Sequence, residues 1–211
     1  MDEQQLTVAE IRSVGENTFT AAFEVPAAFT AYPGQFVNVS MADSDSSESS
    51  FYTISSPGAD GTVEIVFDAG PDSELGRHLA DSDPGTTVSV AGPTGETYYK
   101  GEQSVVALAG GPGIGAAIGI GERALAEGHD VAIVYEGTPV CEPQLQELST
   151  GGAHVDIVEG EDRLAEAVSK ALETVDGSVM IYGYDEFIER ATDALTAAGE
   201  DPKAASMSNY G

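Results

Sequence analysis

The segment Ser104–Ala117, SVVALAGGPGIGAA, constrains the fold of this chain more than any other stretch. A short apolar run ends in glycines and passes directly into residues that favour a helix. This order predicts a β-strand, a tight turn and a helix N-terminus, where unpaired backbone N–H groups and the helix dipole favour an anion. The glycines fit a dinucleotide fingerprint, Gly111-x-Gly113-x-x-Ala116, and they also fit the double-glycine loop of another family.

The residues before this segment predict a six-stranded antiparallel β-barrel. Short runs rich in Val, Thr, Phe and Ile alternate with turn signals such as Pro33-Gly34 and Pro84-Gly85, and such close spacing is typical of a small barrel. One helical stretch, Ser73–Ala80, interrupts them. The expected strands are Leu6–Val14, Thr18–Val25, Gln35–Met41, Phe51–Ser56, Thr62–Asp68 and Thr86–Ala91.

After Gly101 the pattern changes to strands that alternate with helices, which predicts a five-stranded parallel nucleotide-binding α/β domain. The expected strands are Ser104–Ala109, Asp130–Tyr135, His154–Val158, Ser178–Tyr182 and Lys203–Met207, and the expected helices lie near Gly113–Glu127, Pro143–Leu148, Asp162–Thr174 and Tyr184–Ala198. We therefore expect a barrel domain at residues 1–101 and an α/β domain at residues 102–211.

The charge balance argues against two classes of partner. The chain has 36 acidic and 8 basic residues, a net charge of −28, whereas nucleic acids and anionic membranes are bound by clustered Lys and Arg. The carboxylates are spread through patterned segments, as on the solvated surfaces of proteins from salt-accumulating halophiles. Because the Debye length is only ~3 Å at molar salt, we expect a fold that needs high salt.

Composition also limits location and metal chemistry. The N-terminal residues lack the basic and apolar regions of a signal peptide, and no apolar run is long enough to span a bilayer, so a cytoplasmic protein is expected. The single Cys141 cannot form an internal disulfide or supply a Cys-ligated zinc or iron–sulfur site. Three scattered histidines, His78, His129 and His154, suggest no metal site.

Five short motifs occur in one order along the chain. They are Pro33–Phe36 (PGQF), Ser50–Pro57 (SFYTISSP), Ala91–Gly95 (AGPTG), Gly110–Gly115 (GGPGIG) and Tyr182–Tyr184 (YGY). In this order and spacing they resemble the motifs of the ferredoxin–NADP reductase superfamily. The resemblance implies a flavin, FAD or FMN, in the barrel and a nicotinamide dinucleotide in the α/β domain.

The flavin side of the resemblance rests on SFYTISSP. It implies that Tyr52 packs against the flavin ring system and that the Thr53 hydroxyl lies near flavin N5, the atom that receives hydride. Ser55 and Ser56 would line the same edge. For Tyr52 taken alone, the alternative is an ordinary half-buried strand tyrosine.

One residue departs from the family pattern, because Ser50 stands where the family has an arginine that pairs with the flavin phosphates. No Lys or Arg occurs from Ser13 to Gly76, and the first available cation is Arg77. The family cradles the pyrophosphate on the short helix that begins near Ser73. We therefore expect Ser73, Gly76 and Arg77 to meet the phosphates; the alternative is a surface arginine and a flavin held weakly or not at all.

The nucleotide side of the resemblance rests on the glycine turn and the strand after it. Gly110, Gly111 and Gly113 would face the dinucleotide phosphates, although glycine-rich loops also serve helix–strand packing. Glu136 can accept the 2′-OH of NADH and would repel the 2′-phosphate of NADPH. Since no Lys or Arg lies between Arg123 and Arg163, NADH is favoured over NADPH; alternatively, Glu136 is one acid among many.

Two further residues take positions near the reacting rings by resemblance. Tyr182, followed by Gly183, replaces a cysteine that many relatives place beside the nicotinamide. Tyr210 could stack on the flavin face and be displaced by nicotinamide, and a frayed terminus is the alternative.

The leading hypothesis is a flavin-dependent oxidoreductase of the ferredoxin reductase type. It would pass hydride from NADH or NADPH to a bound flavin, and electrons would continue to a ferredoxin, another redox protein or a small molecule. Two alternatives remain open: an electron-transfer subunit or free-flavin reductase with loosely held flavin, and a non-catalytic nucleotide-binding module.

Overall fold

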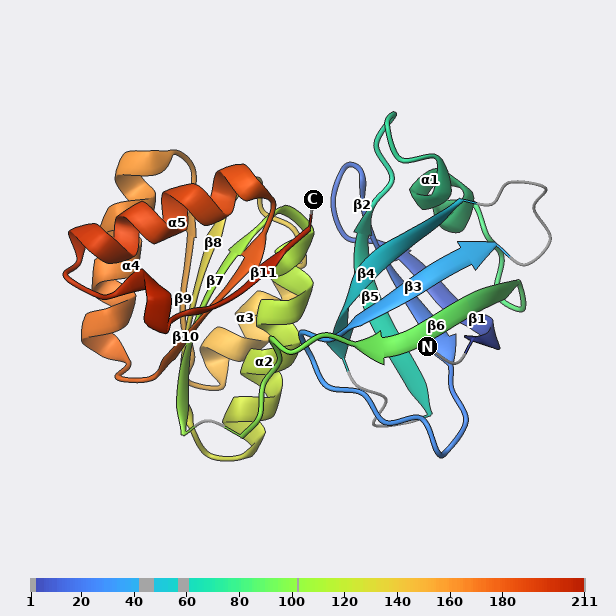
Figure 1. The fold of residues 1–211 in the computed structure, drawn as a ribbon, viewed down its shortest axis with the longest axis horizontal. Helices are drawn as coiled ribbons and strands as arrows, with labels where there is room; N and C mark the ends of the chain where they lie inside the picture. The colour runs from blue at the N-terminus through green and yellow to red at the C-terminus, as the bar shows by residue number, and fades with distance from the viewer. Residues whose placement is uncertain (1–2, 42–47, 57–60, 102, 211) are drawn as a thin grey trace. The chain divides into compact units, whose positions relative to one another are not determined.

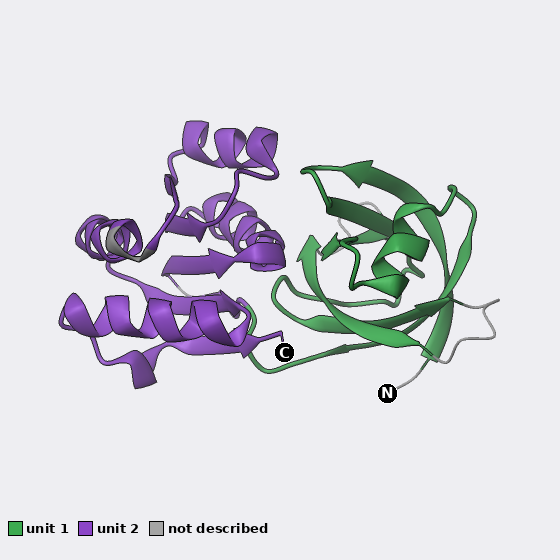
Figure 2. Ribbon diagram, turned by 90° about the horizontal axis from the view of Figure 1, so that it is seen from above, with its two compact units in different colours: residues 1–98 green, residues 99–211 purple. Residues whose placement is uncertain are grey.

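The computed structural model describes residues 3–41, 48–56, 61–101 and 103–210. Pro57, the last residue of the SFYTISSP motif, lies outside the described residues. Contacts divide the chain into two compact units, residues 1–98 and 99–211, which Figure 2 colours separately. Each unit has a hydrophobic core of its own.

The first unit is a closed antiparallel barrel with the strand order β1-β2-β5-β4-β3-β6 (Figure 1). Its elements are β1 (Glu3–Ser13), β2 (Thr18–Glu24), β3 (Phe36–Met41), β4 (Ser49–Ser56), β5 (Thr62–Asp68), α1 (Glu74–Ala80) and β6 (Thr87–Thr94). Pairing of β1 with β6, from Glu3 opposite Ala91 to Thr7 opposite Thr87, closes the barrel. The predicted six-stranded barrel is confirmed.

Alternation along the strands fills the barrel interior. On β3, Val37 and Val39 are buried, and on β5 the side chains of Val63, Ile65 and Phe67 are fully buried. Successive strand residues face opposite sides of a sheet, so these five positions form one inward face. Burial of each such side chain contributes about 1.5–3 kcal/mol.

The second unit is a parallel sheet of order β11-β10-β7-β8-β9 (Figure 1). Its elements are β7 (Ser104–Gly110), the 3-10 turn η1 (Gly111–Gly113), α2 (Ile114–Ala126), β8 (Asp130–Glu136), α3 (Glu142–Thr150), β9 (His154–Val158), α4 (Glu161–Thr174), β10 (Ser178–Gly183), α5 (Asp185–Ala197), η2 (Pro202–Ala204) and β11 (Ser206–Asn209). The predicted five-stranded parallel sheet is confirmed.

Helices cover both faces of this sheet, as a parallel sheet requires. Helices α4 and α5 pack on one face with a core that includes Val106 and Leu108 of β7 and Ala132 and Val134 of β8. Figure 1 shows α2 and α3 on the opposite face. Because the side-chain period of a strand is two, Glu136 continues the series that faces α4 and α5.

The last strand differs from its predicted position. Lys203–Met207 was the expected strand, whereas Pro202–Ala204 forms η2 and the strand is Ser206–Asn209. Asp201 accepts a hydrogen bond from the Lys203 N–H and caps this turn, and Pro202 suits its first position. The strand therefore begins only after the turn, at Ser206, which lies opposite Met180 of β10.

The described residues include no helix that combines the length and the apolar character needed to cross a bilayer.

Candidate functional site

Strand β4 carries the SFYTISSP residues and is held by the PGQF loop. The Gly34 N–H donates to the Ile54 carbonyl at 3.0 Å, and the Ile54 N–H donates to the Gln35 carbonyl at 2.7 Å. The two predicted hydroxyl residues on either side of Ile54, Thr53 and Ser55, are 5% and 3% exposed. Two motifs that are separate in sequence thus form one backbone clamp.

The ring of Tyr52 packs toward the barrel core. It is partly buried and meets Phe67 edge-on, with ring centroids 5.9 Å apart and an interplanar angle of 66°. Strand alternation accounts for this direction, because Tyr52 shares its face with the fully buried Ile54. Tyr52 is thus a half-buried strand tyrosine, and part of its ring stays exposed.

A cation outside the segment considered in the sequence contacts β5, the neighbour of β4. The Arg12 guanidinium donates to Glu64 Oε2 at 2.6 Å, and the Ser55 hydroxyl donates to Glu64 Oε1 at 3.5 Å. Arg12 comes from β1, just outside the segment without cations, and lies 52 positions from Glu64. It is also 3.4 Å from Glu10, so its charge is already balanced by carboxylates.

Helix α1 gathers the three residues expected at the flavin phosphates. The Ser73 side chain accepts from the Gly76 N–H at 3.2 Å. A Cβ on Gly76 would lie 2.2 Å from the Asp68 carbonyl oxygen, so this glycine is required for packing of α1 on β5. The Arg77 Nε donates to the Ser73 carbonyl at 3.3 Å, and the side chain is exposed.

The residues at the start of α1 suit a flavin whose phosphate charge is met by one cation, Arg77. Arg77 takes part in none of the ion pairs seen in the described part of the chain. Its guanidinium is exposed beside the helix start and is accessible to a phosphate. Hydroxyl groups on β4 supply neutral hydrogen-bonding groups, as a ring edge and a ribityl chain require.

Packing requires two glycines of the turn, Gly110 and Gly113, and also Gly183 at the end of β10. A Cβ on Gly113 would lie 2.2 Å from the backbone oxygen of Tyr182, and one on Gly110 would lie 2.4 Å from the Phe187 ring. A Cβ on Gly183 would lie 2.6 Å from the ring of the same residue, Phe187. The packing role that the sequence left open for the glycine loop therefore applies to Gly110 and Gly113, and Gly183 has a packing role as well.

Gly111 and the start of α2 have a different character. Gly111 has a φ of +56°, a conformation that glycine adopts without strain, and the nearest atom to a Cβ there would be 3.6 Å away, on Tyr184. Helix α2 begins without a side-chain cap and without an acid in its first turn. The Ile114 N–H at its start is bonded to carbonyls of η1, and the helix dipole makes this helix start suitable for a phosphate.

Glu136 ends β8 and is held by a cation from a distant element. Arg190 of α5 donates to Glu136 Oε2 through Nη2 at 2.7 Å and through Nε at 3.0 Å. The two residues are 54 positions apart, so a search for basic residues along the neighbouring sequence could not find the partner. Burial raises the pKa of the preceding Tyr135 to about 12, with a smaller contribution from Cys141, so that side chain stays neutral.

The two tyrosines expected near the reacting rings differ in exposure, because Tyr182 is buried and Tyr210 is half-buried. Tyr182 is fully buried, and its hydroxyl lies 3.9 Å from the sulfur of Met180. The Tyr210 N–H donates to the Gly183 carbonyl at 3.0 Å, and its ring meets Tyr184 edge-on at 6.0 Å. Tyr210 thus follows the paired strand β11 rather than a frayed end.

The carboxyl edge of the parallel sheet brings most of the nucleotide-side predictions together. In register, Gly110 lies opposite Glu136 and Gly183 lies opposite Asn209. Ligands of open α/β sheets bind at this edge. The part of the chain that the structure describes contains no group of three or more His, Cys, Asp or Glu side chains arranged to hold a metal ion.

Comparisons with known proteins agree with an architecture of a closed antiparallel barrel followed by a five-stranded parallel sheet. Residues 5–99 match the family model described as "Oxidoreductase FAD-binding domain". The match covers nearly the whole barrel unit and relates it to the FAD-binding domains of oxidoreductases. A search of curated proteins finds no match.

Solved structures share the fold over nearly the whole chain. A ferredoxin NADP+ reductase from Neisseria gonorrhoeae with bound FAD and NADP superposes with a TM-score of 0.82 at 17% identity, covering 99% of both chains. The ferredoxin reductase of carbazole 1,9a-dioxygenase gives 0.81 at 16% identity, covering 100% of this chain and 70% of its own. Amycolatopsis cytochrome P450 reductase GcoB gives 0.78 at 18% identity, covering 99% and 70%. At these identities the superpositions establish a shared fold.

Proposed function

We propose that this protein is a flavin-dependent oxidoreductase of the ferredoxin reductase type that takes hydride from NADH in preference to NADPH. The observation that carries the proposal is the match of the barrel to FAD-binding domains of oxidoreductases, which includes the SFYTISSP strand. A bound flavin, FAD in the first place, supplies a hydride acceptor at N5 and releases electrons singly or in pairs.

In the barrel domain, Thr53 and Ser55 would bind the ring edge through their hydroxyl groups, with Ser56 at the end of the same strand. The backbone clamp from the PGQF loop supports this role, because it fixes the β4 segment that carries these hydroxyls. Tyr52 would contribute its exposed part, and its contact with Phe67 holds the ring in one orientation.

In the α/β domain, the nucleotide would lie across the carboxyl edge of the sheet, with its phosphates at Gly111 and the α2 N-terminus. Glu136 would accept the 2′-OH of the adenosine ribose. Tyr182 would contribute only its backbone, together with Gly183, because its side chain is buried. Tyr210 would stack where the nicotinamide arrives, supported by its hydrogen bond to Gly183.

The test is the visible spectrum of the full chain, purified in molar salt and supplied with FAD, before and after anaerobic addition of NADH. We expect the absorbance of an oxidised flavin that bleaches with NADH and more slowly with NADPH. A protein that shows no flavin absorbance, or whose flavin neither nucleotide bleaches, contradicts the proposal.

Arg77 is expected to supply the missing phosphate cation. The substitution Arg77→Ala should weaken flavin binding about tenfold, because a charge-assisted hydrogen bond to phosphate is worth about 1.5–3 kcal/mol. Flavin titration followed by fluorescence quenching measures this. Arg123→Ala is the matched control, since Arg123 pairs with Glu127 on α2 at 3.1 Å. Equal flavin affinity in the Arg77 variant and wild type would refute the role.

Ser50 favours one further candidate, a reductase that holds flavin loosely as a substrate. No charge from this position can retain the flavin phosphates. Gel filtration separates the two functions: flavin that stays with the protein supports a bound cofactor. Flavin that is lost, together with NADH oxidation that depends on added free flavin, supports a free-flavin reductase or electron-transfer subunit. NADH binding with no oxidation by any acceptor identifies a non-catalytic module.

A further inference from the structure

The ion pair between Arg190 and Glu136 lies where the carboxyl end of β8 meets α5. The Nη2 and Nε groups of Arg190 donate to Glu136 Oε2 at 2.7 and 3.0 Å. The Glu136 side chain is 10% exposed and that of Arg190 is 31% exposed. Charges this far withdrawn from water interact more strongly than a surface pair.

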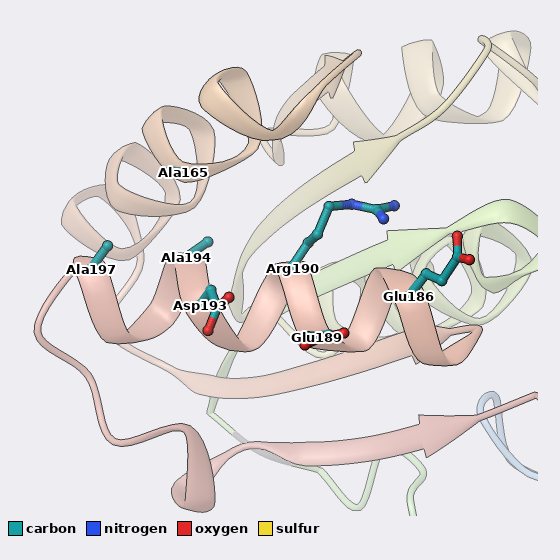
Figure 3. Close-up of a pocket in the computed structure, with 7 residues that line it drawn as sticks. All are labelled: Ala165, Glu186, Glu189, Arg190, Asp193, Ala194 and Ala197. Carbon is teal, nitrogen blue, oxygen red and sulfur yellow. The ribbon is translucent and has the colours of Figure 1, made fainter.

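Arg190 brings its charge to the carboxyl edge from the flank of α5 that borders Ala165 of α4. In Figure 3 its side chain runs toward the N-terminal end of the helix, where Glu186 lies. It borders a hollow of about 510 Å³ lined by Ala165, Glu186, Glu189, Arg190, Asp193, Ala194 and Ala197. Arg190 is the one basic residue of this lining, so its charge is directed at Glu136.

We propose that Arg190 is a specificity-determining residue that reduces the discrimination of Glu136 against the 2′-phosphate of NADPH. The inference rests on the proposed function, because it assigns the ribose 2′ position of the nucleotide to Glu136. An unpaired carboxylate accepts a 2′-OH and repels a 2′-phosphate. The Arg190 guanidinium, 2.7 Å from this carboxylate, cancels much of the charge that would repel the phosphate.

The two residues therefore act in opposite directions on one ratio, the dissociation constant of NADP+ divided by that of NAD+. Without Arg190, Glu136 keeps its full negative charge in a poorly solvated position, and the phosphate is repelled more. Without the carboxylate, Glu136 no longer offsets the positive charge of Arg190, and this charge attracts the phosphate. Loss of both charges should leave the ratio near the wild-type value.

Isothermal titration calorimetry of the full chain with NAD+ and NADP+, at one molar salt concentration, tests the inference without flavin turnover. We expect Arg190→Gln to raise the ratio about tenfold through weaker NADP+ binding, and Glu136→Gln to lower it about tenfold, as one charge interaction at short range predicts. The double variant should return close to wild type. Arg190→Lys, which keeps the charge, should change the ratio less than Arg190→Gln does.

Glu189→Gln is the matched control, because it removes a carboxylate from the same helix and the same hollow, and it should leave the ratio unchanged. Thermal unfolding of each variant identifies loss of structure, which would weaken the binding of both nucleotides alike. Variants of Arg190 and Glu136 that leave the ratio unchanged, while wild type binds both nucleotides, overturn this inference and leave the proposed function standing. A folded wild-type protein that binds neither nucleotide overturns both.

Discussion

Lowering the KCl concentration from about 2 M to about 0.05 M is expected to unfold this protein cooperatively, because the Debye length rises from a few ångströms to more than ~10 Å. The chain has 36 acidic and 8 basic residues. Even if every basic residue were paired, the remaining carboxylates would repel one another. A domain has about 5–15 kcal/mol of net stability, and we expect this repulsion to remove most of it in dilute buffer.

Circular dichroism during stepwise dilution of KCl measures the effect. Sucrose at high concentration is the control, since it favours the compact state by exclusion from the surface and does not screen charge. It should restore little structure in dilute salt. A cooperative thermal transition with the same midpoint at low and high KCl would contradict the prediction.

Gly113→Ala is expected to destabilise the α/β domain by about 3 kcal/mol or more, at the upper end of the cost of overpacking. The new Cβ would lie 2.2 Å from the backbone oxygen of Tyr182 and 2.7 Å from its carbonyl carbon. Both atoms belong to β10, an interior strand of the sheet, so η1 would have to move away from it. Gly113 itself has an ordinary φ of −57°, and the obstacle is space alone.

Gly111→Ala is the matched control from the same turn. It would place an alanine at a φ of +56° with its nearest neighbour 3.6 Å away, and left-handed backbone costs a non-glycine residue about 1–2 kcal/mol. Denaturant unfolding in high salt compares the two variants. If Gly113→Ala is as stable as wild type, or loses less than Gly111→Ala, the packing explanation for Gly113 is wrong.

The strand and helix pattern of both units could be predicted because it depends on local signals. Short runs rich in Val, Thr, Phe and Ile between turn signals identified the six barrel strands, and β5 at Thr62–Asp68 matches its expected bounds. The strand-turn-helix order at Ser104–Ala117 is realised as β7, η1 and α2. The last strand was misplaced because Pro202 and the Asp201 cap form a turn where a weak apolar run had suggested a strand.

The candidate site could be predicted only in part, because side-chain partners come from elements that are distant in sequence. Glu136 was singled out from its place at a strand end. Its cation, Arg190, comes from a helix that follows two strands later. Likewise Arg12 of β1 lies just before the segment without cations that begins at Ser13. The fold places this arginine on Glu64 of β5.

The sequence by itself determined the barrel, the parallel sheet and the position of a glycine turn between a strand and a helix, because hydrophobic period and turn chemistry act over a few residues. The tertiary structure alone decided what the glycines and charges do. It brought the Tyr182 carbonyl against Gly113 and the Phe187 ring against Gly110, so these glycines are explained by packing. It also neutralised Glu136 with Arg190, because strand register and helix packing choose the partner of a buried charge.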